Sequence, residues 1–425
     1  MSRWRHFRQQ LLLFAIFSLP FTHVPTVDIF FRWRIYEFIA WFGSPIILGN
    51  RLYLGNRSTR LFLLFLGGYI IYTALIGLAM AFFVNIEVPA ALEGTLHPFF
   101  RTALESMRFG AGFVLLLGCL KYAVTFEDLK VILKALILGG IMSSIYAVYE
   151  GLVLYVGLPG PLGPGSRSLP GFPVAGSMYE ASAAGTYAAV TMLLSLGVFL
   201  ERKFFLSGIG IISSVLGILI TTSRTGVVAA LVGSFIFIGL LIKIQKIRQV
   251  SITMFTSIII YLIGSIVAIG VIGELFYNRL YLAEYQLQYH LSIREQVYKN
   301  ALLDFMRYPA GLGQGLWLYL EGGGVGWARL AVEGGIIGLF LITNAIVALG
   351  YCISRLVSQD LTALEASIIS AVCSTFVALF NYVNITDSWI LVVLGLPFVA
   401  LKVHDLQNTD QQPGKGIIRT SRSEL

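Results

Sequence analysis

Charged residues are scarce in this 425-residue chain, because they make up only 12% of it while 57% of the residues are hydrophobic. An ordinary soluble domain carries about 25% charged residues. The mean hydropathy is +0.81. Apolar runs of about 20 residues, each long enough to cross the hydrocarbon core of a bilayer, recur along the sequence. This scarcity of charge excludes a soluble globular protein and predicts a set of membrane helices.

Residues suited to redox and metal chemistry are also few. The three cysteines, Cys119, Cys352 and Cys373, lie within or beside apolar runs and have neither metal-ligand nor disulfide spacing. The five histidines form no metalloprotease-like pair. No P-loop is present, which argues against ATP chemistry. The glycine-rich segment 158–176 lacks the Lys-Ser/Thr of a nucleotide loop and is typical of an irregular lid. We therefore expect no metal and no cofactor.

The apolar runs predict an all-α bundle of about twelve transmembrane helices. Their predicted ranges are 9–25, 33–49, 61–84, 108–124, 131–156, 178–199, 204–221, 226–242, 251–273, 326–350, 366–384 and 388–402. The first nine lie within 1–273 and the last three within 326–402. A large extramembrane loop, 274–325, separates the two groups, and a polar, disordered tail is predicted for 403–425. The N-terminal residues lead into an apolar run without a cleavage pattern, so we interpret them as part of a retained first helix.

The distribution of lysine and arginine predicts the orientation. A cytoplasmic N-terminus places most of the 30 basic residues on the inner side, as the positive-inside rule requires. The short outer loops then hold only Arg32, Arg34, Arg101, Arg108 and Arg167. We therefore expect both termini in the cytoplasm and the loop 274–325 outside. The net charge of +8 follows this bias and does not call for a nucleic-acid partner.

Arg224 is the first candidate functional residue, because an ionisable group within an apolar region is costly. It lies in TTSRTG, at a tight outer junction between two predicted helices, among threonine and serine hydroxyls. Free backbone N–H groups at the start of the following helix favour an anion there. This combination suits a phosphate or diphosphate. The alternative is an arginine that reaches toward a lipid headgroup.

The loop 274–325 supplies further candidates. Residues 291–305 are predicted to form an amphipathic helix, whose apolar face holds Ile293, Val297, Ala301, Leu302 and Phe305. Tyr308-Pro309 ends this helix, and AGLGQG makes a tight turn after it. Arg294 begins the helix, with His290 one turn before it and Tyr298 one turn after. Arg294 either closes over an anionic lipid head or belongs to a solvated face, and His290 is either an acid or base or a structural residue.

Three more ionisable residues lie at predicted outer helix ends. Glu180, in GSMYEASAAGTY, is either the partner of a buried arginine or a proton acceptor, and we favour an arginine partner. Arg329 and Glu333 are four residues apart and therefore share a helical face. They form either a mutual structural ion pair or part of a functional cavity.

The order of these motifs resembles the O-antigen ligase/polymerase family. The short TSRTG turn follows the seventh predicted helix, and LSIREQVYKNALLDFMRYPAGLGQG looks like the family's arginine, helix, proline and Gly-x-Gly signature. ARLAVEGGIIGLF looks like the E-x-G-I-x-G start of its tenth helix. The resemblance covers about 175–350, whereas the first 150 residues are similar in hydropathy alone.

The resemblance implies a site on the outer face of a bacterial inner membrane. Arg224 and Arg294 match the two arginines to which the family's diphosphate binding is attributed. Guanidinium groups suit this role and would stabilise the leaving diphosphate without a metal. Arg329 and Tyr298 are the further substrate-binding candidates. The implied partners are an undecaprenyl-diphosphate-linked oligosaccharide, membrane lipids and a chain-length regulator protein.

One departure from the family changes the expected reaction. Its ligases carry a histidine shortly before the Gly-Ile pair, but Gly324 stands near that place and 305–350 contain no histidine. The resemblance therefore implies a polymerase, a glycosyltransferase that joins lipid-linked repeat units, with His290, Glu180 or Glu333 as its base. The segments 158–176 and 274–325 would roof its cavity. A ligase with another base is the alternative. A transporter of the same lipid-linked sugars is the alternative from a different class, although we find no internal repeat.

Overall fold

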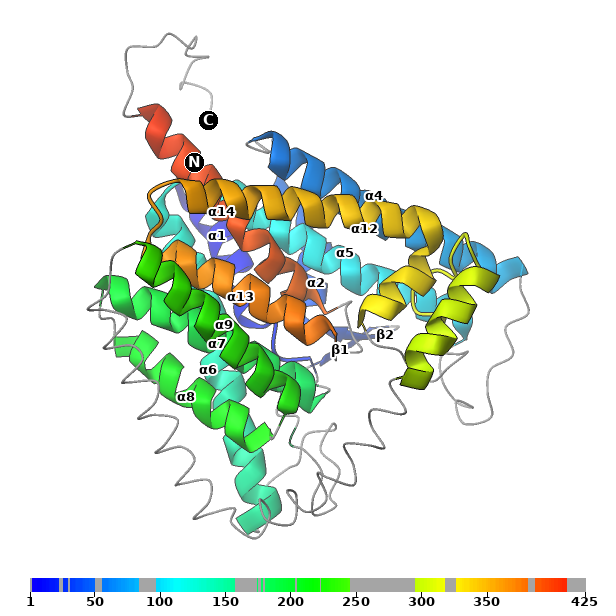
Figure 1. Cartoon of the computed structure of the whole chain (residues 1–425), viewed down its shortest axis with the longest axis horizontal. Helices are drawn as coiled ribbons and strands as arrows, with labels where there is room; N and C mark the ends of the chain where they lie inside the picture. Colours follow the sequence, from blue (N-terminus) through cyan, green and yellow to red (C-terminus); the bar gives the residue numbers. More distant parts are fainter. Residues whose placement is uncertain are drawn as a thin grey trace.

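The structure is a computed structural model of the chain. It describes residues 2–22, 26–29, 31–49, 56–83, 97–156, 174, 177–178, 180–202, 205–221, 223–244, 295–317, 326–380 and 387–410. Within these ranges, long helices lie side by side and one small β-hairpin lies at one end of them (Figure 1). The predicted helix 251–273, the segment 158–173, His290, Arg294 and the tail 411–425 lie outside the described residues.

The N-terminal region is less regular than the two predicted helices 9–25 and 33–49. Its elements are α1 (Ser2–Phe17), β1 (Thr26–Ile29), β2 (Phe31–Arg34), α2 (Ile35–Phe42) and α3 (Ser44–Leu48). The strands are antiparallel, with Thr26 opposite Arg34 and Ile29 opposite Phe31. The predicted second span is wrong as a continuous helix. It breaks at Gly43, where Pro45 at the start of α3 cannot donate the backbone hydrogen bond of an uninterrupted helix.

The later predicted helices that fall within the described residues appear close to their expected places. They are α4 (Arg57–Phe83), α5 (Pro98–Tyr122), α6 (Phe126–Val156), α7 (Ala181–Arg202), α8 (Phe205–Thr221), α9 (Arg224–Lys243), α12 (Gly326–Ser358), α13 (Ala363–Leu379) and α14 (Ser388–Asp410). Seven described helices are long and apolar enough to cross a membrane, namely α4, α5, α6, α7, α9, α12 and α14. The apolar helices α8 and α13 are shorter.

The largest boundary error concerns α5, which begins at Pro98 and not at 108. Proline suits the first turn of a helix because its missing N–H has no partner there, and His97 Nδ1 accepts a hydrogen bond from the backbone N–H of Phe99. Arg101 and Arg108, assigned above to an outer loop, therefore belong to α5. At the other end of the chain, α14 continues past the predicted end at 402 to Asp410.

Helix α7 is the centre of the bundle and packs against α6, α8, α9 and α13. Small residues make this close packing feasible, as is common between membrane helices. Gly197 of α7 lies against Ser367 of α13, and Gly210 of α8 lies against Ser195 of α7. A side chain at either glycine would overlap its neighbour.

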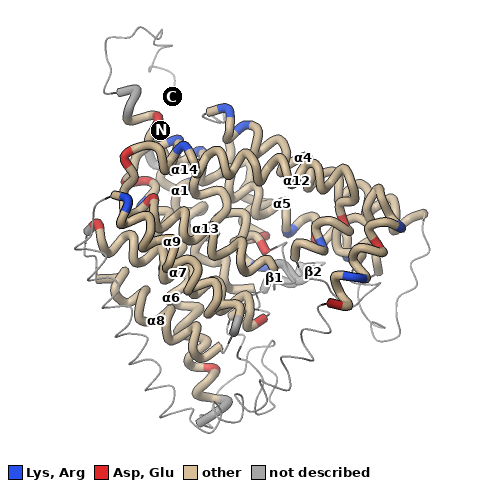
Figure 2. The backbone as a smooth tube through the Cα atoms, in the orientation of Figure 1, with Lys and Arg blue, Asp and Glu red and all other residues tan. Residues whose placement is uncertain are grey.

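Charged residues gather at the two ends of the bundle (Figure 2). We call them the network end and the opposite end. At the opposite end, Arg355 of α12 pairs with Asp405 of α14 at 2.9 Å, and Asn56 before α4 donates to the same carboxylate. Lys121 and Lys402 donate there to the backbone carbonyls of Leu48 and Leu120. The network end holds the first turns of α5, α12 and α14 and is described below.

A helix at 295–307 crosses the network end, running across α12 instead of along it (Figure 1). The prediction of a helix ended by Tyr308-Pro309 is confirmed, and Val297, Ala301 and Phe305 face its core side. Leu302, predicted on the same face, is exposed instead. Glycines at 311, 313 and 315 with φ of 92°, 86° and 82° form the expected turn. Helix α12 kinks beside this turn at Gly335, where φ is 57°.

Candidate functional site

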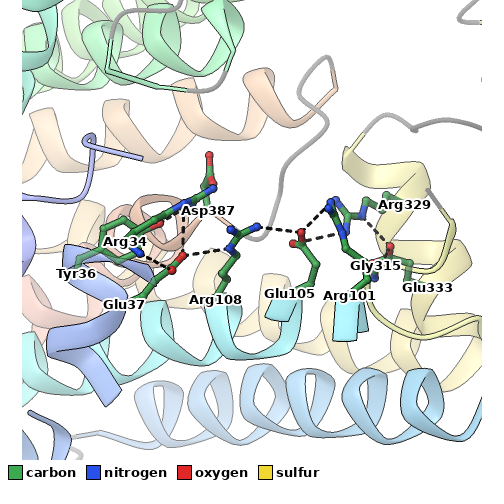
Figure 3. Close-up of polar contacts among 10 residues, drawn as sticks. All are labelled: Arg34, Tyr36, Glu37, Arg101, Glu105, Arg108, Gly315, Arg329, Glu333 and Asp387. Atoms are coloured by element: carbon green, nitrogen blue, oxygen red, sulfur yellow. Dashed lines mark hydrogen bonds and ion pairs between the residues drawn. The ribbon is translucent and has the colours of Figure 1, made fainter. Parts of the chain in front are cut away.

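The network end is built around a chain of buried ion pairs, shown in Figure 3. Its first part joins the start of α2 to the start of α14. Arg34 Nη1 lies 2.9 Å from Asp387 Oδ1 and donates to the hydroxyl of Tyr36 at 2.7 Å. Its backbone N–H donates to Glu37 Oε2 at 3.0 Å. Burial lowers the pKa of Arg34, but Tyr36, Asp387 and Glu37 together raise it above its ordinary value, so the guanidinium stays charged.

The chain of pairs continues along α5. Arg108 joins Glu37 and Glu105, each at 3.3 Å. Glu105 also receives Arg101 Nη2 at 3.0 Å, and Arg329 of α12 approaches its second oxygen at 3.9 Å. Glu105 and Arg329 are each about 1% exposed, so these charges lie in the interior of the bundle.

The last part ties α12 to the turn after the 295–307 helix. Glu333 Oε1 accepts from Arg329 Nε at 2.8 Å and from the backbone N–H of Gly315 at 2.9 Å. The ion pair that the spacing of Arg329 and Glu333 allowed is therefore confirmed. Their assignment as substrate-binding and catalytic residues stays a prediction.

The charges in these described pairs are balanced. We define the ion-pair network as eight residues: Arg34, Arg101, Arg108, Arg329, Glu37, Glu105, Glu333 and Asp387. Four of them are arginines and four are acids (Figure 3). Buried charges need paired partners because the desolvation of each ion is costly. These described pairs fix α2, α5, α12 and α14 relative to one another.

The backbone of the glycine-rich turn is occupied by the protein itself. Leu312, Gly313 and Gln314 donate their N–H groups to the carbonyls of Val332, Glu333 and Thr73. Gly315 donates to Glu333 as described above. A cradle of N–H groups for a phosphate needs free donors, and the N–H groups of 312–315 are not free. The turn is therefore a structural connection between α4, α12 and the 295–307 helix.

Glu180 lies just before α7 and not inside the helix as predicted. Its described hydrogen bond is from the hydroxyl of Ser182, at 3.1 Å. Burial is the main cause of the raised pKa of Glu180, and the negative charge of Asp387 raises it further. The hydrogen bond from Ser182 and the positive charge of Arg329 lower the pKa in part. Within the described residues, no arginine pairs directly with Glu180, so the favoured arginine partner is not found among them. A half-buried carboxylate with a raised pKa is a better proton acceptor than an ordinary one.

The turn that holds Arg224 lies against this end of α7. Arg224 is the first residue of α9, and the hydroxyl of Ser223 caps the helix by accepting from the N–H of Gly226 at 3.1 Å. Gly226 packs backbone to backbone on Gly185 of α7. The preceding residue, Ala184, donates its N–H to the carbonyl of Glu180. Arg224, the first residue of α9, and Glu180, just before α7, therefore lie at the starts of two neighbouring helices at the same end of the bundle.

The candidates from the long loop are only partly described. Tyr298 is 42% exposed, and its hydroxyl donates to the carbonyl of Phe380 at 3.5 Å. His290 and Arg294 lie outside the described residues. In the described part of the chain, no group of His, Cys, Asp and Glu has the arrangement of a metal site.

Most of the ion-pair network is not apparent from the sequence alone. Arg101, Glu105 and Arg108 follow one another at helical spacing, which would have marked one face of a membrane helix had the start of α5 been placed correctly. Arg34 and Asp387 are 353 positions apart, and no local pattern indicates their pairing.

The fold defines a class: a polytopic helical membrane protein with about seven candidate spans in the described residues. A scan with models of known protein families found none that matches the chain, and a search of curated proteins found no similar sequence.

Proposed function

We propose that this protein is a polysaccharide polymerase, a glycosyltransferase that joins undecaprenyl-diphosphate-linked repeat units at the network end. The observation that carries the proposal is the placement of Arg224 and Glu180. Arg224 is the first residue of α9 and Glu180 directly precedes α7, and the backbones of the two helices touch at Gly226 and Gly185. This placement brings a cation and a proton acceptor to one region of one membrane face.

In the proposed reaction, a sugar hydroxyl of one lipid-linked unit attacks the anomeric carbon of a second lipid-linked glycan. A new glycosidic C–O bond forms, and the bond from the anomeric carbon to the diphosphate breaks. Undecaprenyl diphosphate leaves as an anion, stabilised by Arg224 and Arg294, and the hydroxyl proton passes to a carboxylate. The network end would face the extracytoplasmic side of the membrane, as the distribution of lysine and arginine predicts.

Glu180 is the base we favour among the three candidates. Glu333 Oε1 already accepts from Arg329 and Gly315 and is about 2% exposed, so this carboxylate is engaged in holding the turn. Glu180 is more accessible and has a raised pKa. His290 remains a sequence-based alternative. Arg329 would act as a positioning residue through Glu333 and Glu105.

The ionisable residues described here support an enzyme over the alternative transporter. Arg101, Glu105 and Arg108 lie in the first three turns of α5, and Arg329 and Glu333 in the first two turns of α12. A transporter would place its charges near the bilayer midplane with access from both sides. A buried ion-pair network at one end instead suits a rigid support beside a site with access from one side.

The test replaces Arg224 or Arg294 with alanine in cells and compares the glycans on a gel. Because the diphosphate would lose a cation, we expect single repeat units in place of long chains. Arg355→Ala is the matched control, since Arg355 pairs with Asp405 at the opposite end. Normal chain length in stably inserted Arg224 and Arg294 variants would overturn the proposal. Full-length polymer stranded on the carrier lipid would favour the ligase.

A further inference from the structure

The 295–307 helix has two different apolar sides. Its core side, formed by Val297, Ala301 and Phe305, packs on a small core of the network end. The other members of this core are Leu312, Leu316, Trp317, Ala328 and Val332. The N–H of the Trp317 ring donates to Asp304 at 2.9 Å, which fixes the helix on this core.

The second apolar side faces away from the protein. Tyr298, Leu302 and Met306 are four residues apart and form one stripe, and they are 42%, 61% and 61% exposed. Leu303, at the edge of this stripe, is also exposed. Gln296, Asn300 and Arg307 lie on the remaining, polar side, and the exposed Glu295–Lys299 ion pair borders the stripe. A helix whose apolar stripe is bordered by charged and polar residues is typical of the membrane–water interface.

The position of the 295–307 helix along the bundle agrees with a place at the membrane–water interface. Met80 of α4 packs against the same small core. Beyond Met80, the side chains of Phe82 and Phe83 are still 72% and 89% exposed, so the apolar surface of α4 reaches at least as far out as the helix. Exposed aromatic side chains at this height are compatible with contact with lipid. The helix crosses the end of the bundle, as an interfacial helix does (Figure 1).

The exposed stripe also adjoins the lipid-facing side of α12. The carbonyl of Pro309, just after the helix, accepts from the N–H of Ile336 at 2.9 Å. Ile336, Ile337 and Phe340 follow along α12 with exposed side chains. Tyr298 adds an aromatic ring whose hydroxyl reaches a carbonyl at the end of α13, and tyrosine is enriched at membrane interfaces.

From these contacts we infer that the 295–307 helix lies in the membrane–water interface, with Tyr298, Leu302 and Met306 among the lipid acyl chains just below the headgroups. The helix is then a part of the bilayer-facing surface and not a free roof over the cavity. This inference does not depend on the proposed enzymatic activity.

Spin labelling tests this placement in the full-length protein in lipid nanodiscs. A nitroxide is attached at Leu302→Cys or, as the matched control, at Gln296→Cys on the polar side, after Cys119, Cys352 and Cys373 are replaced with alanine. We expect the label at 302 to be severalfold more accessible to oxygen than to a water-soluble nickel chelate. The label at 296 should show the reverse preference.

Two results would overturn the inference. Equal access of the nickel chelate to both labels would mean that the stripe is in water. Shielding of the label at 302 from both reagents would mean that protein, such as a second copy of the chain, covers it. If the cysteine-free protein does not fold, benzoylphenylalanine at 302 and 296 provides a second measurement. Photocrosslinks to lipid at 302 but not at 296 support the inference, and their absence at 302 contradicts it.

Discussion

The carboxylate of Glu333 accepts the backbone N–H of Gly315 at 2.9 Å while it also holds the guanidinium of Arg329. One side chain thus connects α12 to the turn that follows the 295–307 helix. The position of that helix depends on this connection. The ion-pair network therefore stabilises the region in which we propose that the reaction occurs.

Removal of Glu333 should destabilise the protein strongly. In Glu333→Ala the N–H of Gly315 loses its acceptor and Arg329 loses its 2.8 Å partner, and breaking a buried ion pair costs about 3–5 kcal/mol. Glu295→Ala is the control, because Glu295 pairs with Lys299 at 2.8 Å on the exposed surface, where such pairs contribute little. Thermal melting in nanodiscs measures both. Similar melting temperatures for Glu333→Ala and wild type would contradict the assigned role.

Alanine at Gly313 should disrupt the turn. Its φ is 86°, a conformation that favours glycine, and a Cβ would overlap the backbone of Gly77 in α4. We expect Gly313→Ala to lower the melting temperature clearly. Gly350→Ala in α12 should be neutral or slightly stabilising, because nothing lies within 4 Å of its added Cβ and alanine is the better helix former. Equal effects of the two substitutions would mean that the turn does not contact α4 as described.

Glu180 should make stability depend on pH. Burial raises its pKa in the folded state above about 4.3, the value of an unfolded chain. The folded protein therefore binds this proton more tightly, and its stability falls as pH rises from the unfolded pKa through the folded one. Glu180→Gln removes this loss of stability. The variant should therefore have a higher melting temperature than wild type at neutral pH, and the same melting temperature as wild type at about pH 4. A melting temperature of Glu180→Gln below that of wild type at neutral pH would show that the charged carboxylate of Glu180 has a stabilising partner.

The same residue should set the pH profile of glycan transfer. A base must be deprotonated to act, so wild-type activity should rise with pH through the raised pKa of Glu180. Glu180→Gln should lose most of the activity together with this rising limb, and Glu180→Asp should keep part of both. An unchanged pH profile in Glu180→Gln would exclude Glu180 as the base and return attention to His290.

Much of the helical architecture could be predicted from the sequence, because membrane helices need long apolar runs whose positions hydropathy identifies. Ranges such as 204–221 and 226–242 agree with α8 and α9 within a few residues. The errors arise where polar residues enter a helix. The first turns of α5 contain charged residues, so hydropathy placed its start too late in the sequence. Gly43 and Pro45 interrupt an apolar run, which forms two helices, α2 and α3.

The candidate site could be predicted only in part. The helical spacing of Arg329 and Glu333 indicated their ion pair, and the glycines of AGLGQG indicated a tight turn. Contacts between distant segments, such as Gly315 with Glu333 or Gly226 with Gly185, follow from tertiary packing. Leu302 belongs to the predicted apolar face but is exposed, because hydropathy alone does not distinguish an exposed apolar side chain from a buried one.

The most direct test of the central claim is a reaction with purified protein in nanodiscs, supplied with an undecaprenyl-diphosphate-linked repeat unit and a metal chelator. We predict lipid-linked glycans of increasing length, released undecaprenyl diphosphate, and loss of both products in Arg224→Ala but not in Arg355→Ala. Repeat units that remain single with folded wild-type protein, or chains that Arg224→Ala extends as well as wild type does, would contradict the claim.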